Sequence, residues 1–165
     1  MQTRIGKGNP YGSHQHILIK ILPKIDNDIV EFGVGIFSTP VFYNHVFKYN
    51  GFFLAFETDA SYVSQFKSYE CDNFKIIHVK NWNDVYNNDM LDKSWNLVFV
   101  DQHPWEPRLV TIQKMIDKCD YLILHDAQHL KERPFKYLKE FGAGTAEEPS
   151  TLICSNFKSI PDIMA

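Results

Sequence analysis

The sequence lacks the features of a membrane, secreted or disulfide-stabilised protein. It has only three cysteines in 165 residues, and they form neither a C-x-x-C pair nor a zinc-binding spacing. We expect all three to be small buried side chains in a reducing compartment. The polar, glycine-rich start has no apolar segment of the signal-peptide kind, and no apolar run approaches the ~20 residues of a membrane helix. We therefore expect a soluble, cytoplasmic protein without a membrane partner.

Concentrated positive charge is also missing. The chain has 17 Lys and Arg against 20 Asp and Glu, which gives a formal net charge of −3. No stretch rich in Lys and Arg is interleaved with aromatic side chains. Proteins whose main task is to grip a nucleic-acid backbone present a concentrated positive face. The composition therefore favours a small-molecule ligand over a nucleic acid.

What the sequence does contain is a regular alternation of apolar strand-like runs and helix-like segments. Strands are predicted at Asp28–Val34, Phe52–Phe56, Lys75–Lys80, Trp95–Val100 and Asp120–Leu124. Helices are predicted at His14–Lys24 with Ser13 as cap, Thr39–Lys48, Ala60–Tyr69, Asn83–Leu91 and Pro107–Lys118. Near-continuous apolar strands separated by helices indicate a parallel sheet covered on both faces. The predicted fold class is α/β, with a doubly wound, Rossmann-like sheet.

The last part of the chain departs from this alternation. Phe135–Phe141 and Thr151–Phe157 predict two strands, and the segment Gly142–Ser150 between them has no helical pattern. Such a pair predicts an antiparallel finish to an otherwise parallel sheet. The chain has no internal repeat or linker, so we expect one domain over residues 1–165, with residues 1–12 flexible.

The most informative segment is Glu31–Thr39, E-F-G-V-G-I-F-S-T, which follows a strand and opens a helix. Gly33 and Gly35 allow the backbone to approach a ligand closely, and the helix N-terminus offers free N–H groups. A tight turn without a ligand is the alternative. Glu57 ends the second strand about twenty residues farther on, where nucleotide-binding αβ folds place an acid for ribose hydroxyls. Asp59 is better placed to cap the next helix.

Together these segments resemble the class I S-adenosylmethionine-dependent methyltransferases. Glu31, Gly33 and Gly35 resemble the first motif of that family, and Glu57 resembles its ribose-binding acid. The segments NLVFVDQHP (96–104) and YLILHDA (121–127) resemble the ends of its fourth and fifth strands. The resemblance spans about residues 28 to 157. It implies S-adenosylmethionine as cofactor and methyl transfer as the reaction.

The resemblance also implies further cofactor contacts. Ser38 and Thr39 are expected to donate hydrogen bonds, because Phe37 stands where many family members have a third glycine. A dehydrogenase usually keeps that glycine, so its absence favours methyl transfer. Trp82 and Asp84 follow the third strand, where such enzymes contact adenine. The alternative for this segment is a helix N-cap at Asn83 or Asp84.

Two acids and several histidines are candidates for the chemistry. Asp101, itself also a predicted cofactor contact, and Asp126 end neighbouring strands of the predicted order, so their side chains are expected to meet at the mouth of a cleft. Paired carboxylates suit Mg²⁺, as in the similar catechol-type O-methyltransferases, where the metal orients and acidifies substrate hydroxyls. Without a metal, His103, His125 or His129 is a candidate general base. Only structural roles are expected for His14, His16, His45 and His78.

We predict an S-adenosylmethionine-dependent methyltransferase that methylates the oxygen of a small hydroxylated acceptor, such as a sugar. One alternative is a catalytically silent cofactor-binding subunit, because the chain has little room for a substrate lid. The other is a nucleic-acid methyltransferase, which is disfavoured because the segment 101–105 reads DQHPW and not Asn/Asp-Pro-Pro-aromatic. The sequence leaves open whether a metal is required and whether the chain forms a homo-oligomer.

Overall fold

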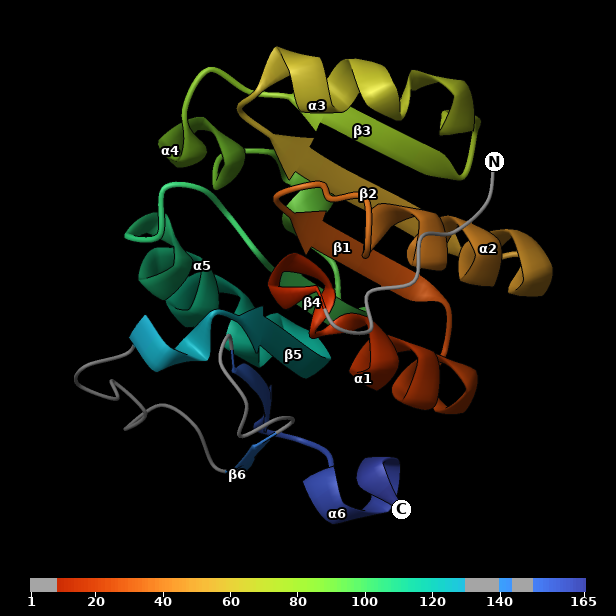
Figure 1. Ribbon diagram of the computed structural model, residues 1–165, viewed down its shortest axis with the longest axis vertical. Helices are drawn as coiled ribbons and strands as arrows, with labels where there is room; N and C mark the ends of the chain where they lie inside the picture. Colours follow the sequence, from red (N-terminus) through yellow and green to blue (C-terminus); the bar gives the residue numbers. More distant parts are fainter. Residues whose placement is uncertain (1–8, 130–139, 144–149) are drawn as a thin grey trace.

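The protein forms a seven-stranded sheet with helices on both faces (Figure 1). The computed structural model describes residues 9–129, 140–143 and 150–165. The strands are β1 (Asp28–Phe32), β2 (Phe52–Glu57), β3 (Phe74–His78), β4 (Trp95–Val100), β5 (Cys119–His125), β6 (Glu140–Ala143) and β7 (Thr151–Ser155). The α-helices are α1 (Gln15–Ile21), α2 (Thr39–Tyr49), α3 (Ala60–Gln65), α4 (Trp82–Val85), α5 (Pro107–Met115) and α6 (Ile160–Met164).

The strand order is β3-β2-β1-β4-β5-β7-β6. The first five strands pair in parallel, and β7 is antiparallel to both β5 and β6. This confirms the predicted doubly wound sheet with an antiparallel finish. The order reverses between β1 and β4, and folds of this kind bind ligands beyond the carboxyl ends of the strands at such a switch point. Most of the predicted strand Phe135–Phe141 lies outside the described residues.

Two apolar layers hold the helices to the sheet. Alternate strand residues, such as Ile29 and Leu97, pack with α1, α2 and α6 on one face. Their neighbours Val30 and Val98 pack with α4 and α5 on the other (Figure 1). Strands buried on both faces are apolar at successive positions, because alternate side chains point to opposite layers. This is why the strands could be recognised as continuous apolar runs.

The same alternation places four polar side chains on the face of α1 and α2. Glu31 follows Ile29 by two residues, Glu57 follows Ala55, Asp101 follows Phe99 and His125 follows Ile123, and these four apolar residues all belong to that layer. Val100 pairs with Phe32 and with Leu124, so Asp101 comes next to the residues that follow β1 and to the end of β5. The register therefore gathers these polar residues at one edge of the sheet.

Four of the five predicted helices are shorter than predicted, because their last residues form separate 3₁₀ turns. These turns are η2 (Leu22–Lys24), η3 (Lys67–Tyr69), η4 (Asp89–Leu91) and η5 (Ile116–Lys118), whereas α2 ends one residue later than predicted. Two further 3₁₀ turns, η1 (Pro10–Gly12) and η6 (Ala127–His129), precede α1 and follow β5. Ser13 does not cap α1; its hydroxyl lies 3.1 Å from Nε2 of His125. The short helix α6 was not predicted, and it is held by its buried Ile160 and Ile163. No helix in the described part of the chain is long and apolar enough to cross a membrane.

The cysteines differ from the expectation at one position. Cys119 and Cys154 are buried, and burial raises the pKa of both thiols, that of Cys154 to about 12. Cys71 is exposed. Two of the three cysteines therefore serve as small apolar side chains in the core, as expected, whereas the third faces solvent.

The two glycines after β1 have different roles. Gly33 has a φ of +93°, and a Cβ atom on it would lie 2.4 Å from the carbonyl oxygen of Asp101. The nearest atom to a Cβ on Gly35 would be Oγ of Ser38, at 3.2 Å. Gly33 is therefore required by the packing of β1 against the end of β4, and only Gly35 lines the cavity described below.

Because of this difference, replacement by alanine is expected to destabilise the protein more at Gly33 than at Gly35. Gly33→Ala is expected to lower the free energy of unfolding by about 2–4 kcal/mol, because it combines a strained φ with a backbone clash. Gly35→Ala is the matched control and is expected to cost less than about 1 kcal/mol. Urea unfolding followed by circular dichroism measures both. Equal stabilities would show that the close approach of Gly33 to Asp101 does not constrain the fold.

Candidate functional site

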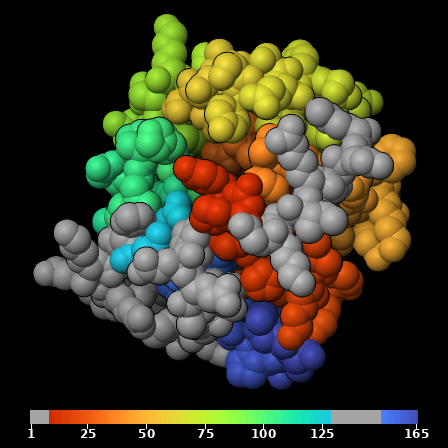
Figure 2. All heavy atoms as spheres, viewed as in Figure 1, coloured from red at the N-terminus to blue at the C-terminus, as the bar shows by residue number. Residues whose placement is uncertain are grey.

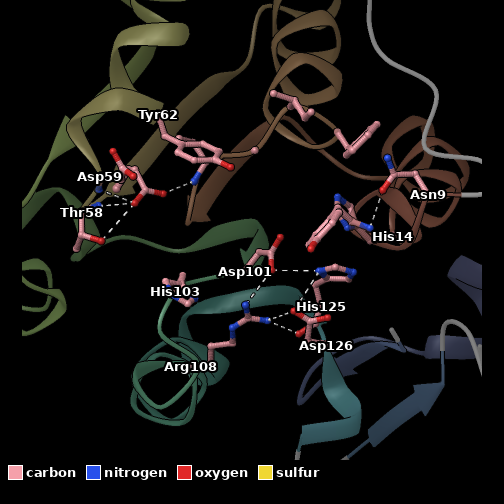
Figure 3. A pocket seen from close by; sticks show the side chains of 16 residues that line it. Asn9, His14, Thr58, Asp59, Tyr62, Asp101, His103, Arg108, His125 and Asp126 are labelled. Carbon is pink, nitrogen blue, oxygen red and sulfur yellow. Dashed lines mark hydrogen bonds and ion pairs between the residues drawn. The ribbon is translucent and has the colours of Figure 1, made fainter. Parts of the chain in front are cut away.

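A cavity of about 490 Å³ opens at the carboxyl ends of β1, β2, β4 and β5 (Figure 3). Its walls come from η1 and the start of α1, the loop after β1, the β2–α3 connection, and the segments that follow β4 and β5. Asn9 and Tyr11, within the segment expected to be flexible, belong to this wall. In Figure 2 the start of the described chain, drawn in red, lies in the middle of the view, between the yellow region of α3 and the cyan residues of η6.

At one end of the cavity, Glu57 is fixed by backbone N–H groups. Its Oε2 accepts a hydrogen bond from the N–H of Val34 (3.0 Å), and its Oε1 accepts from those of Thr58 (2.6 Å) and Asp59 (2.8 Å). The carboxylate therefore ties the glycine loop to the end of β2. Asp59 caps α3 by accepting from the N–H of Ser61 (2.7 Å), as predicted.

Three of the predicted cofactor contacts lie behind this wall. The hydroxyl of Thr39 donates to Oε2 of Glu31 (2.7 Å) and accepts from the N–H of Gly35 (3.0 Å). Glu31 is fully buried, and this burial raises its pKa well above the ordinary value. Ser38 is buried too. None of the three is among the residues that line the cavity, and Glu31 and Thr39 brace the glycine loop from behind.

The two residues expected at adenine also lie elsewhere. Trp82 is buried in the layer beneath α4 and α5, where its indole N–H donates to the carbonyl of His103 (2.9 Å). Asp84 is exposed and accepts from the side chain of Asn81 (2.7 Å), whose own side chain caps α4. Neither lines the cavity. A helix cap does form in this segment, but it is Asn81, and not Asn83 or Asp84 as the alternative had it.

At the other end of the cavity, the residues after β4 and β5 form a charged cluster (Figure 3). Nδ1 of His125 lies 3.1 Å from Oδ1 of Asp101. The guanidinium of Arg108 lies 3.0 Å from the same oxygen and 3.4 Å from Oδ2 of Asp126. Asp126 has a φ of 55°, a left-handed conformation that Asp adopts more readily than most residues. The structure thus brings Asp101, His125 and Asp126 together, as the sequence suggested.

Arg108, which was not among the predicted site residues, is the cation of this cluster. Arg108 is buried in the first turn of α5, where it also donates to the carbonyls of Gln102 (2.7 Å) and His125 (2.6 Å). Burial by itself raises the pKa of Asp101, but the hydrogen bond from His125 and the charge of Arg108 outweigh it. The pKa of Asp101 therefore lies below its usual value. Two acids that meet at one cleft need an offsetting group, and this requirement is the signal that could have led to Arg108.

The predicted Mg²⁺ site between Asp101 and Asp126 does not fit this geometry. Arg108 contacts both carboxylates, and it occupies the position of the counter-ion that a metal would provide. Mg²⁺ also prefers oxygen ligands in an octahedral arrangement, whereas the next atoms near the two carboxylates are nitrogens, Nδ1 of His125 at 3.1 Å from Asp101 and Nε2 of Gln128 at 3.5 Å from Asp126. The arginine replaces the magnesium ion that the sequence suggested.

The histidines that line the cavity differ in part from those predicted as candidate general bases. His103 lines the cavity and is exposed, and the side chain of His129 lies outside the described residues. His14, for which only a structural role was expected, lines the cavity close to His125, with 4.4 Å between the ring centroids. Burial lowers the pKa of His14 to about 3, so its ring is neutral near pH 7.

No protein-family model matches the sequence, and no curated protein matches it. Solved structures do match. A methyltransferase from Podospora anserina with bound SAH has a TM-score of 0.63 and 11% identity, over 87% of this chain and 77% of that one.

Two further structures differ in the acceptors that their names imply. The O-methyltransferase TomG of tomaymycin synthesis from Streptomyces achromogenes, in complex with SAM, has a TM-score of 0.59 and 16% identity, over 90% of this chain and 80% of that one. An rRNA methylase from Streptococcus thermophilus has a TM-score of 0.56 and 11% identity, over 87% and 95%. The chain has the fold of the class I S-adenosylmethionine-dependent methyltransferases.

Proposed function

We propose that this protein is an S-adenosylmethionine-dependent methyltransferase that methylates a hydroxyl group of a small acceptor, such as a sugar. The observation that carries this proposal is the pair formed by Asp101 and His125, which faces the same cavity as the glycine loop and Glu57. One end of the cavity is thus suited to the cofactor and the other to the activation of an acceptor.

The charge of the cavity supports a cationic cofactor. Among the described residues, four carboxylates line it, those of Glu57, Asp59, Asp101 and Asp126, against the single guanidinium of Arg108. This balance favours a sulfonium and disfavours the phosphates of a dinucleotide or of a nucleic acid. When bound, S-adenosylmethionine supplies a methyl group already activated by the positive sulfur. Glu57 would accept hydrogen bonds from the ribose, beside the backbone of Gly35.

At the acceptor end, the protein has to receive the proton that the hydroxyl loses. With the proton of its neutral ring on Nδ1, His125 donates to Asp101, and its Nε2 is free to accept from a hydroxyl. Ser13 provides such a hydroxyl in the structure, at 3.1 Å. Asp101, whose lowered pKa keeps it ionised, orients the ring and stabilises it after the proton arrives. Arg108 holds both carboxylates in place and takes no part in the proton transfer.

The first prediction concerns the cofactor. Isothermal titration is expected to show binding of S-adenosylmethionine or of its demethylated product, and Glu57→Ala is expected to weaken it by at least ~1 kcal/mol through lost hydrogen bonds. Asp84→Asn is the matched control, since that exposed carboxylate lies outside the cavity, and it is expected to bind normally. Binding of NAD in place of both compounds would contradict the proposal, and a loss with Asp84→Asn would return that residue to the adenine site.

The second prediction concerns catalysis. In assays with radiolabelled S-adenosylmethionine and a panel of sugars and other small polyols, the wild type is expected to label an acceptor. Asp101→Asn and His125→Gln are expected to slow this transfer by at least ~100-fold, the usual contribution of general base catalysis, with cofactor affinity within about threefold of the wild type. His16→Gln, an exposed histidine on α1, serves as control.

The alternatives give different results in the same assay. A wild type that binds the cofactor but labels no member of the panel would favour the catalytically silent subunit. Labelling of RNA or DNA but of no small molecule would favour the nucleic-acid methyltransferase. Full transfer by both variants would mean that Asp101 and His125 only stabilise the end of the sheet.

A further inference from the structure

The proposed reaction gives no role to His14, a buried side chain in the wall of the cavity. His14 is 2% exposed, and among the described residues neither Nδ1 nor Nε2 of its ring has a hydrogen-bond partner. Its ring contacts are with the rings of Phe99 and His125, at centroid distances of 5.0 and 4.4 Å. A buried polar group without a partner costs stability, and in native proteins it commonly marks a site for an ion, a water or a ligand.

His14 lies beside Asp101 and His125, whose side chains are also of the types that bind metal ions in proteins. One ligand atom each from His14, Asp101 and His125 lie within 4.8 Å of one another. Nδ1 of His125 and Oδ1 of Asp101 are 3.1 Å apart. In a tetrahedral site with ligands at ~2.1 Å from the metal ion, every two ligand atoms are separated by about 3.4 Å. An inward movement of the imidazole of His14 by about 1–2 Å would therefore complete the set.

We propose that His14, Asp101 and His125 form a binding site for a divalent transition metal of the Zn²⁺ type. Two imidazole nitrogens and one carboxylate oxygen suit borderline ions such as Zn²⁺, Co²⁺ and Fe²⁺, and they disfavour Mg²⁺ and Ca²⁺. Three protein ligands leave positions open, and all three residues line the cavity, so the open positions would face a bound molecule.

The surroundings of these residues match those of a metal site. Nε2 of His125 lies against the hydroxyl of Ser13, so the ring can donate there and direct Nδ1 to the ion. Arg108 donates to Asp101, and in Figure 3 it lies on the opposite side of the Asp101–His125 pair from His14. The guanidinium thus fixes the ligand carboxylate without standing between the three ligands. The other carboxylates of the cavity offset the added charge.

This inference deepens the proposed function, although the binding site itself does not depend on it. An acceptor hydroxyl bound at an open position would be acidified by the metal and would release its proton to solvent water at the mouth of the cavity, while His125 would serve as a ligand in place of a proton acceptor. Both versions of the reaction need Asp101 and His125. Only the metal-dependent version needs a nitrogen from His14 at the ion.

Metal binding can be measured without any acceptor. Untagged protein carrying Cys71→Ser, which removes the exposed thiol as a competing ligand, is titrated with Zn²⁺ by calorimetry and with Co²⁺ by visible absorption. We expect one ion per chain. His14→Gln, His125→Gln and Asp101→Asn are each expected to weaken binding by at least ~10-fold, whereas His16→Gln and Asp126→Asn are expected to stay within about twofold.

Three results would each overturn the proposed metal site. The wild type would bind neither ion stoichiometrically, or His14→Gln would bind the metal with unchanged affinity. In the third, Asp126→Asn would lose as much metal affinity as Asp101→Asn. His14→Phe, which fills the same space without a ligand atom, replaces His14→Gln if circular dichroism shows that the latter is unfolded. Metal binding in a protein that binds no S-adenosylmethionine would retain this site and reject the proposed function, so the two failures can be told apart.

Discussion

The buried guanidinium of Arg108 is the interaction on which the rest of the site depends. It contacts the carboxylates of Asp101 and Asp126 and the backbone carbonyls of Gln102 and His125, and so it joins the ends of β4 and β5. Two acids at one edge of a sheet repel each other unless a cation lies between them. Removal of one partner from such a buried network typically costs about 3–5 kcal/mol, because it leaves charge uncompensated.

The position of this network follows from the two-residue period of the strands and from the close approach of Gly33 to the backbone of Asp101. Alternation directs Asp101 and His125 to the face of α1, so the start of that helix covers them. Gly33 lets the chain after β1 pass within contact of the backbone of Asp101, which sets the glycine loop against the charged cluster. The two ends of the cavity are therefore fixed relative to each other by backbone packing, and not by the flexible side chains that line it.

The sequence predicted those parts of the molecule that depend on local patterns. The five parallel strands are apolar runs because both faces of the sheet are covered, and Asp101, His125 and Asp126 follow two of those runs directly. Arg108 and His14 were missed because nothing local distinguishes a buried arginine or histidine in the first turn of a helix from an exposed one. The same holds for Trp82, which was predicted at the adenine site. From the first position of α4, its side chain packs into the apolar layer between the sheet and α5, a contact that depends on tertiary structure.

Two buried polar side chains beside Asp101 differ in how well they are hydrogen-bonded. The side-chain oxygen of Gln102 accepts from Thr111 and its carbonyl accepts from Arg108, so the supporting side of the network is well satisfied. Neither ring nitrogen of His14, in contrast, has a hydrogen-bond partner among the described residues, and this ring lies in the wall of the cavity. Most buried polar groups in native proteins are paired, so an unpaired group at an open cavity indicates a contact for a bound ion or molecule. The ring of His14 and the charged cluster thus point, by separate physical arguments, to the same edge of the sheet.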